Sequence, residues 1–163
     1  MKKLLLFTFW ISLLFITSCS KDDRSEEILS AQKEYLVKQT IIEFNKSAIK
    51  TGKYETFINS FSEKSASGEL SQTEIELLIQ EFLGNQTEEF LNVYYQLEAL
   101  NLTAEEFYSI ADQFEDLRIY LIGLSSNRSQ RGCCDVSDAD DGVLAILLGW
   151  ACNCQETASG EGG

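Results

Sequence analysis

The sequence predicts an all-α fold: a small helical bundle of four or five helices followed by a short cysteine-rich C-terminal segment. Three observations support this prediction. Apolar residues recur three and four positions apart, which places them on one face of a helix. Two capping-box signatures mark helix starts, Ser71 with Glu74 and Thr103 with Glu106. The 163 residues contain no proline, the residue that most often interrupts a helix.

The first two helices are predicted on either side of Gly52, which suits the left-handed position just past a helix end. The first runs from residue 26 to 50, and its inward face can be built from Leu29, Leu36, Ile41, Phe44, Ala48 and Ile49. The second is short and fades into the small residues 65–68; its apolar positions are Tyr54, Phe57, Ile58 and Phe61.

Three further helices are predicted between residues 71 and 124. The helix after Ser71 closes at Gly84 and has the apolar positions Ile75, Leu78, Ile79, Phe82 and Leu83. The next begins at Asn85 or Thr87 and ends at Asn101; its inward candidates are Phe90, Leu91, Tyr94, Tyr95 and Leu97, which we interpret as core rather than as a ligand groove. The last follows Thr103 and carries Phe107, Ile110, Ala111, Phe114, Leu117, Leu121 and Leu124. Their short connections favour antiparallel neighbours.

The N-terminus has the order of features typical of an exported protein. Lys2 and Lys3 precede an apolar run at residues 4–16, which as a helix would span about 20 Å, too short for a hydrocarbon core of about 30 Å. The run ends in Ile-Thr-Ser before Cys19. This motif resembles the lipobox of bacterial lipoproteins, and the resemblance implies cleavage before Cys19 and lipid attachment to its thiol.

The residues after Cys19 suggest where such a lipoprotein would lie. The Lys-Asp-Asp run at residues 21–23 resembles the export tag of surface lipoproteins in Bacteroidota. The resemblance implies an outer-membrane lipoprotein that reaches the cell surface; a periplasmic orientation, with the run as a plain polar tether, stays open.

Charge and composition exclude several function classes. The net charge is −13, and residues 65–117 hold 12 acidic and no basic residues. Such a surface repels phosphate backbones, so we expect no nucleic acid partner. We interpret the acidity mainly as a source of solubility, with a cationic partner or diffuse divalent-cation binding as the alternatives.

The sequence does not indicate an enzyme. It contains no histidine, the usual general base and commonest metal ligand, and none of the common catalytic or cofactor motifs. We therefore expect no catalytic residues, no cofactor and no metal site.

Composition changes sharply after residue 124. Residues 125–131 are polar and include Arg128 and Arg131, which predicts a linker with a protease-accessible site at Arg131. The predicted organisation is therefore a signal peptide (1–18), a lipidated tether (19–25), an acidic helical domain (26–124), a polar linker (125–131) and a cysteine-rich tail (132–163).

The tail holds four cysteines: Cys133, Cys134, Cys152 and Cys154. In an oxidising compartment they are expected to form two disulfides. Neighbouring cysteines are too cramped to pair with each other, so both bonds should cross the gap, which leaves two pairings open. The spacing differs from that of common zinc sites, and the acidic residues 135–141 lack the register of a calcium loop.

The apolar run at residues 143–151 permits two functions. As a helix docked on the body, it belongs to a non-enzymatic binding or scaffold module with an unknown protein or peptide partner. As an exposed segment, it belongs to a peptide released after Arg131. The ending at residues 149–154 (Gly-Trp-Ala-Cys-Asn-Cys) resembles the tails of lipoprotein precursors related to the bacteriocin fulvocin C, which implies a carrier of a disulfide-stapled, bacteriocin-like peptide.

Overall fold

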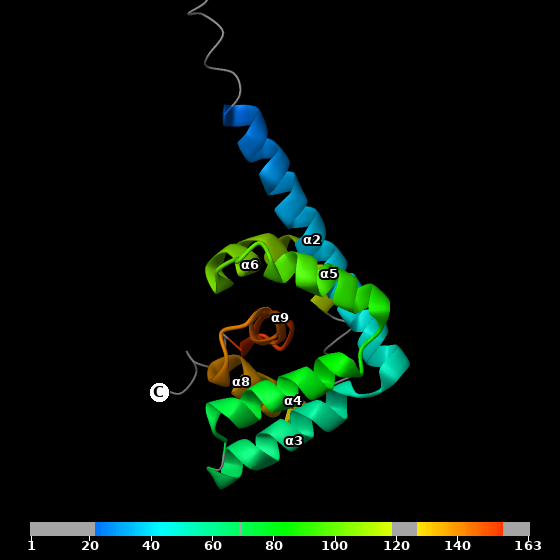
Figure 1. Cartoon of the computed structure of the whole chain (residues 1–163), viewed down its shortest axis with the longest axis vertical. Coiled ribbons are helices and arrows are strands. Elements are labelled where there is room, and N and C mark those ends of the chain that lie inside the picture. The colour runs from blue at the N-terminus through cyan, green and yellow to red at the C-terminus, as the bar shows by residue number, and fades with distance from the viewer. Residues whose placement is uncertain (1–21, 69, 119–126, 155–163) are drawn as a thin grey trace, which may run out of the picture. The chain divides into compact units, whose positions relative to one another are not determined.

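The computed structural model describes residues 22–68, 70–118 and 127–154 (Figure 1). The chain divides into two compact units, residues 1–32 and 33–163. In the first unit the described part is the start of helix α2 (Asp22–Thr51), where Ile28 and Leu29 are exposed. This helix begins inside the segment predicted as a tether, because residues 22–25 are already helical.

Helices α3 (Tyr54–Ser67), α4 (Gln72–Gly84), α5 (Glu88–Glu98) and α6 (Ala104–Ala111) follow α2, and a 3-10 turn, η2 (Asp112–Phe114), continues α6. The C-terminal helices are α8 (Asn127–Ala139) and α9 (Val143–Ala151). The described residues contain no strand, so the all-α prediction is confirmed. Seven α-helices have described bounds, two more than the largest predicted number, because the cysteine-rich segment forms two helices of its own. Residues 115–118, after η2, are also helical.

Three predicted helix starts and the end of α2 are confirmed by local geometry, whereas the helix predicted to run unbroken from Thr103 to Leu124 is interrupted by η2. Glu74 accepts from the Ser71 backbone N–H at 2.9 Å, and Glu106 accepts from that of Thr103 at 3.1 Å. The Ser71 hydroxyl, which also donates to Glu74, and these two backbone bonds hold the pKa of both carboxyls below the ordinary value. Thr87, one of the two predicted caps, accepts from the Phe90 N–H. Gly52 adopts a φ of +62°, as its position past α2 requires.

The core of the second unit is built on a narrow stripe of α2 and on aromatic rings. Phe44 lies between Tyr54, Phe82 and Phe90, and the rings of Phe57 and Phe82 stack at 4.4 Å. The α2 stripe comprises Leu36, Val37, Ile41, Phe44 and Ala48.

Three predicted core residues, Leu29, Ile49 and Tyr95, are exposed, so their assignment to the inward face is wrong. Leu29 precedes the packed part of α2. Ile49 and Tyr95 directly follow the buried Ala48 and Tyr94, about 100° further around their helices, so only the first residue of each pair faces the core. Leu121 and Leu124 lie outside the described residues.

The C-terminal segment is part of this core. Helix α9 lies between the α5–α6 pair and α8, and every residue of α9 except Ile146 is buried (Figure 1). Helix α8 packs on α3 and α9. It begins at Asn127, so residues 127–131 of the predicted linker are helical. The apolar pattern did not predict this helix, because α8 has few apolar residues and is held by close packing rather than by a broad apolar face.

Gly132 makes that close packing possible. A Cβ at this position would lie 2.8 Å from the Ile58 methyl group, 3.0 Å from the Ile58 carbonyl oxygen and 3.1 Å from the Ser62 Cβ. Ile58 is fully buried and its carbonyl belongs to the α3 backbone, so neither can move aside easily.

We therefore expect Gly132→Ala to destabilise the disulfide-intact protein by about 1–3 kcal/mol, the usual cost of overpacking a core. The matched control is Gly84→Ala, where a Cβ meets nothing within 4 Å; this change should be neutral or slightly stabilising. Urea denaturation measures both. Equal effects of the two substitutions would contradict the close approach of α8 to α3.

Candidate functional site

The structure brings together the four predicted cysteines and fixes their pairing. Cys133 is bonded to Cys152 and Cys134 to Cys154, with Cα–Cα distances of 6.3 and 5.4 Å. Both bonds cross the gap, as expected, and they join α8 to the end of α9. No group of three or more potential metal ligands occurs among the described residues. Cys19 lies outside the described residues, and Arg131 lies in α8 with its side chain outside the description.

One of the two disulfides is sealed inside the core. Cys133 and Cys152 are 0% and 4% exposed, and the Tyr54 hydroxyl lies 3.3 Å from both sulfur atoms. Burial raises the pKa of Tyr54, so its hydroxyl remains protonated and neutral in this apolar site. The Cys134–Cys154 bond is half-buried at the edge of the same joint.

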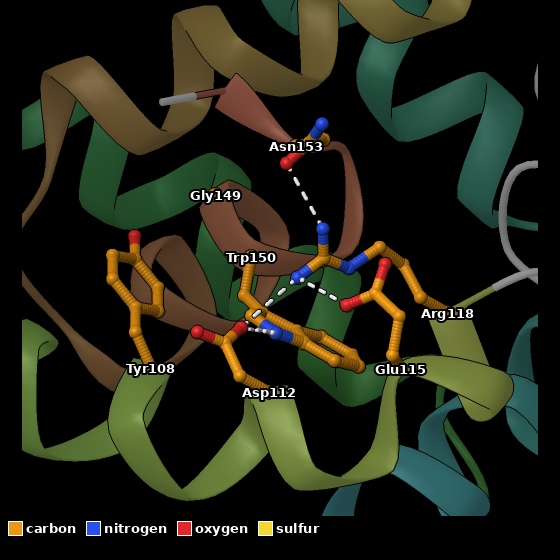
Figure 2. A pocket seen from close by; sticks show the side chains of 7 residues that line it. All are labelled: Tyr108, Asp112, Glu115, Arg118, Gly149, Trp150 and Asn153. Atoms are coloured by element: carbon orange, nitrogen blue, oxygen red, sulfur yellow. Dashed lines mark hydrogen bonds and ion pairs between the residues drawn. The ribbon is translucent and has the colours of Figure 1, made fainter. Parts of the chain in front are cut away.

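A pocket of about 370 Å³ opens where η2 meets the end of α9 (Figure 2). One wall comes from α6, η2 and the helical residues 115–118, and the other from the last turn of α9 and Asn153. Its lining residues are Tyr108, Asp112, Glu115, Arg118, Gly149, Trp150 and Asn153.

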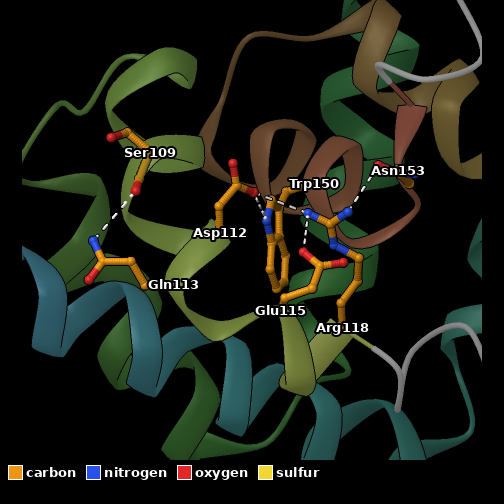
Figure 3. A network of polar contacts seen from close by, with 7 residues as sticks. All are labelled: Ser109, Asp112, Gln113, Glu115, Arg118, Trp150 and Asn153. Atoms are coloured by element: carbon orange, nitrogen blue, oxygen red, sulfur yellow. Dashed lines mark hydrogen bonds and ion pairs between the residues drawn. The ribbon is translucent and has the colours of Figure 1, made fainter.

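Arg118 is the centre of the polar network in this pocket (Figure 3). Its guanidinium donates to Asn153 Oδ1 at 2.9 Å and pairs with Asp112 at 3.2 Å and Glu115 at 3.0 Å. It also lies over the Trp150 ring, 4.6 Å from the centroid. The Trp150 indole N–H donates to Asp112 Oδ1 at 3.0 Å, so one carboxylate oxygen serves both the ring and the guanidinium.

The charges in this pocket are not balanced. Only 10% of the Arg118 side chain is exposed, whereas those of Asp112 and Glu115 are 63% and 61% exposed. Two carboxylates therefore face solvent against one buried cation, which leaves the mouth of the pocket negative. The Arg118 Nε is buried and has no acceptor among the residues that the structure describes.

Gly149 lines the pocket, and its lack of a side chain leaves room for the hydroxyl groups of Ser137 and Tyr108 beside it. A Cβ there would clash with Ser137 Oγ and would lie 2.6 Å from the Tyr108 hydroxyl. Burial raises the pKa of Tyr108, and its hydrogen bond with Ser137 partly opposes that shift. Tyr108 therefore presents a neutral hydroxyl.

A second pocket of about 420 Å³ adjoins the first, and Tyr108 lines both. Its remaining lining residues are Leu102, Thr103, Ala104, Ser137, Asp140, Asp141 and Ile146. Asp140 accepts from the Gly142 N–H at 3.1 Å, so its position is fixed by the turn before α9, while Asp141 is exposed. Apolar and acidic side chains therefore both line this pocket.

Sequence reasoning did not single out Arg118 or Asp112. A signal was nevertheless present: Arg118 is the single basic residue between Lys64 and Arg128, at the end of a purely acidic stretch. An isolated cation in such a stretch is a good candidate for a buried charge pair, but its partners on α9 come from a distant part of the chain.

Comparison with known proteins identifies no relative. No protein-family model, no curated protein and no solved structure matches this chain. Among the described residues, no helix is both long enough and apolar enough to cross a membrane.

The Arg118 network makes a testable contribution to stability. We expect Asp112→Ala to destabilise the protein by about 1–3 kcal/mol, because it leaves the buried Trp150 N–H without its acceptor and the guanidinium with one partner fewer. Chemical denaturation measures the loss.

The matched control is Asp116→Ala, which removes an exposed carboxylate outside both pockets and should change stability by less than about 0.5 kcal/mol. Trp150 emission should shift in Asp112→Ala and stay unchanged in Asp116→Ala. An unchanged stability and emission in Asp112→Ala would show that Asp112 does not hold the indole.

Proposed function

We propose that this chain is a lipid-anchored lipoprotein of the outer bacterial envelope that acts as a non-enzymatic binding or scaffold module. Lipid on Cys19 anchors it, and the described residues of the second unit carry the binding surface. The observation that best supports this proposal is the burial of α9 between α8 and the α5–α6 pair, because it makes the C-terminal segment a wall of the pocket around Arg118.

The chemistry of the Arg118 pocket is the reason for proposing a binding module rather than an enzyme. Its one cation is paired with two carboxylates and an amide, and its tyrosine hydroxyl is bonded to Ser137. Without histidine in the chain, no nucleophile–base pair of the common kind can be assembled around them. Such a pocket is suited to recognising a ligand.

The alternative, a carrier of a releasable bacteriocin-like peptide, is disfavoured by the same burial. Cleavage after Arg131 would cut α8, and removal of the segment would strip Val136, Leu144, Leu147 and Leu148 from the core. Each buried aliphatic side chain of this size contributes about 1.5–3 kcal/mol. Release would therefore require the remaining helices to lose much of their packing.

The anchor is tested by Cys19→Ser in the native host. We expect the unchanged protein in the membrane fraction, as a lipidated species beginning at Cys19, because two or more acyl chains hold a protein stably on a bilayer. The variant should lack the lipid and keep residues 1–18, because acylation and cleavage before residue 19 both depend on the Cys19 thiol. Fractionation followed by intact mass spectrometry without reduction measures both results.

The disulfides serve as the internal control, since both proteins should lack the four hydrogens that two bonds remove. An unchanged protein without lipid, or a Cys19→Ser protein cut at the same bond, would contradict the anchor. A free peptide beginning near Gly132 in the supernatant would contradict the binding module and support the peptide carrier.

A further inference from the structure

The two pockets that share Tyr108 form consecutive parts of one acidic surface along α6 and the α8–α9 joint. Glu115 and Asp112 stand at one end, and Asp140 and Asp141 at the other. We propose that this two-pocket groove binds an extended basic segment of a partner protein, with one lysine or arginine side chain in each pocket. This inference rests on the proposed binding function and names its ligand class.

Charge complementarity is the first argument for a basic ligand. The two pockets together contain four carboxylates and a single cation, Arg118, which is already paired. The surrounding stretch of residues 65–117 has no basic residue to neutralise them. A like-charged ligand would be repelled at both ends, whereas a cationic one is attracted along the whole groove.

The apolar part of the second pocket is the second argument. Leu102, Ala104 and Ile146 line it together with the exposed Asp141. Lysine and arginine carry an apolar stem beneath a charged head, so the stem can pack on these side chains while the head meets the carboxylate. A bare metal ion would make no favourable contact with these apolar side chains.

The unsatisfied donor of Arg118 favours a peptide over a simple polyamine. Arg118 lines the first pocket, and among the described residues its buried Nε has no acceptor. A peptide brings backbone carbonyl oxygens that can accept from this guanidinium, whereas a polyamine has no acceptor to offer. The two carboxylate partners of Arg118 are mostly exposed, so they can shift as a carbonyl approaches.

The experiment titrates the mature, disulfide-intact protein with a short capped peptide that carries two lysines separated by glycines. Once residues 1–18 are removed, Trp150 is the one tryptophan in the chain, and it lines the first pocket. Its emission therefore reports directly on occupancy. We expect a saturable change that weakens as salt is added, and no change with the same peptide carrying glutamates in place of lysines.

The variants Glu115→Gln and Asp141→Asn remove one exposed charge from each pocket. Each should weaken binding about threefold, and the double variant about tenfold, as expected for exposed charge pairs. The matched control Asp116→Asn removes an equal charge outside both pockets and should leave affinity within about twofold. Calorimetry gives the affinities independently of fluorescence, which is needed for Asp141→Asn because Asp141 lines the second pocket and Trp150 the first. Thermal denaturation checks that every variant is folded.

Three outcomes would overturn the inference: no binding of the lysine peptide, binding that Glu115→Gln and Asp141→Asn leave unchanged, or spermidine binding as tightly as the peptide. The last would identify the occupant as a small polyamine. The proposed function fails separately, by the appearance of the released C-terminal peptide or the lack of a lipid anchor, and fractionation of the same protein distinguishes the two failures.

Discussion

The packing of the described residues from 33 onward depends on the burial of α9, which lies between α8 and the α5–α6 pair and is joined to α8 by two disulfides. The run Val143–Ala151 has no polar side chain except the indole N–H of Trp150, so it is stable only inside an apolar core. Burying this helix costs the conformational entropy that the C-terminal segment would have as a free chain end. The Cys133–Cys152 and Cys134–Cys154 bonds limit that entropy, and because they close nearly the same loop, their contributions of about 2–4 kcal/mol each do not simply add.

The polar pocket is a consequence of the same arrangement. The last turn of α9 places Trp150 and Asn153 against η2, and the Trp150 N–H needs an acceptor there, which Asp112 supplies. Arg118 then neutralises part of the charge while its guanidinium covers the ring. One end of the buried helix thus produces both a stabilising network and an acidic, concave surface. This coupling explains why the candidate binding site lies at the joint between the body and its C-terminal segment.

Much of the helical body could be predicted from the sequence, because local signals determine it. The capping boxes at Ser71 and Thr103, the cap at Thr87 and the left-handed Gly52 all lie where the pattern places them. Errors arose where tertiary packing decides: Ile49 and Tyr95 directly follow buried positions, and α8 has too few apolar residues to be seen as a helix. The cross-gap disulfides followed from spacing, but their pairing did not. The pocket could not be predicted, because Asp112 and Arg118 meet their partners only through the docking of a distant helix.

The central claim, that α9 is an integral part of the folded body, is tested most directly by hydrogen exchange of the native, oxidised protein followed by mass spectrometry. We expect the amides of α9 to exchange only through global unfolding, with the same free energy as those of the core helix α3. Exchange of α9 through a much smaller opening free energy than that of α3 would contradict the account, because the C-terminal segment would then detach while the body remains folded.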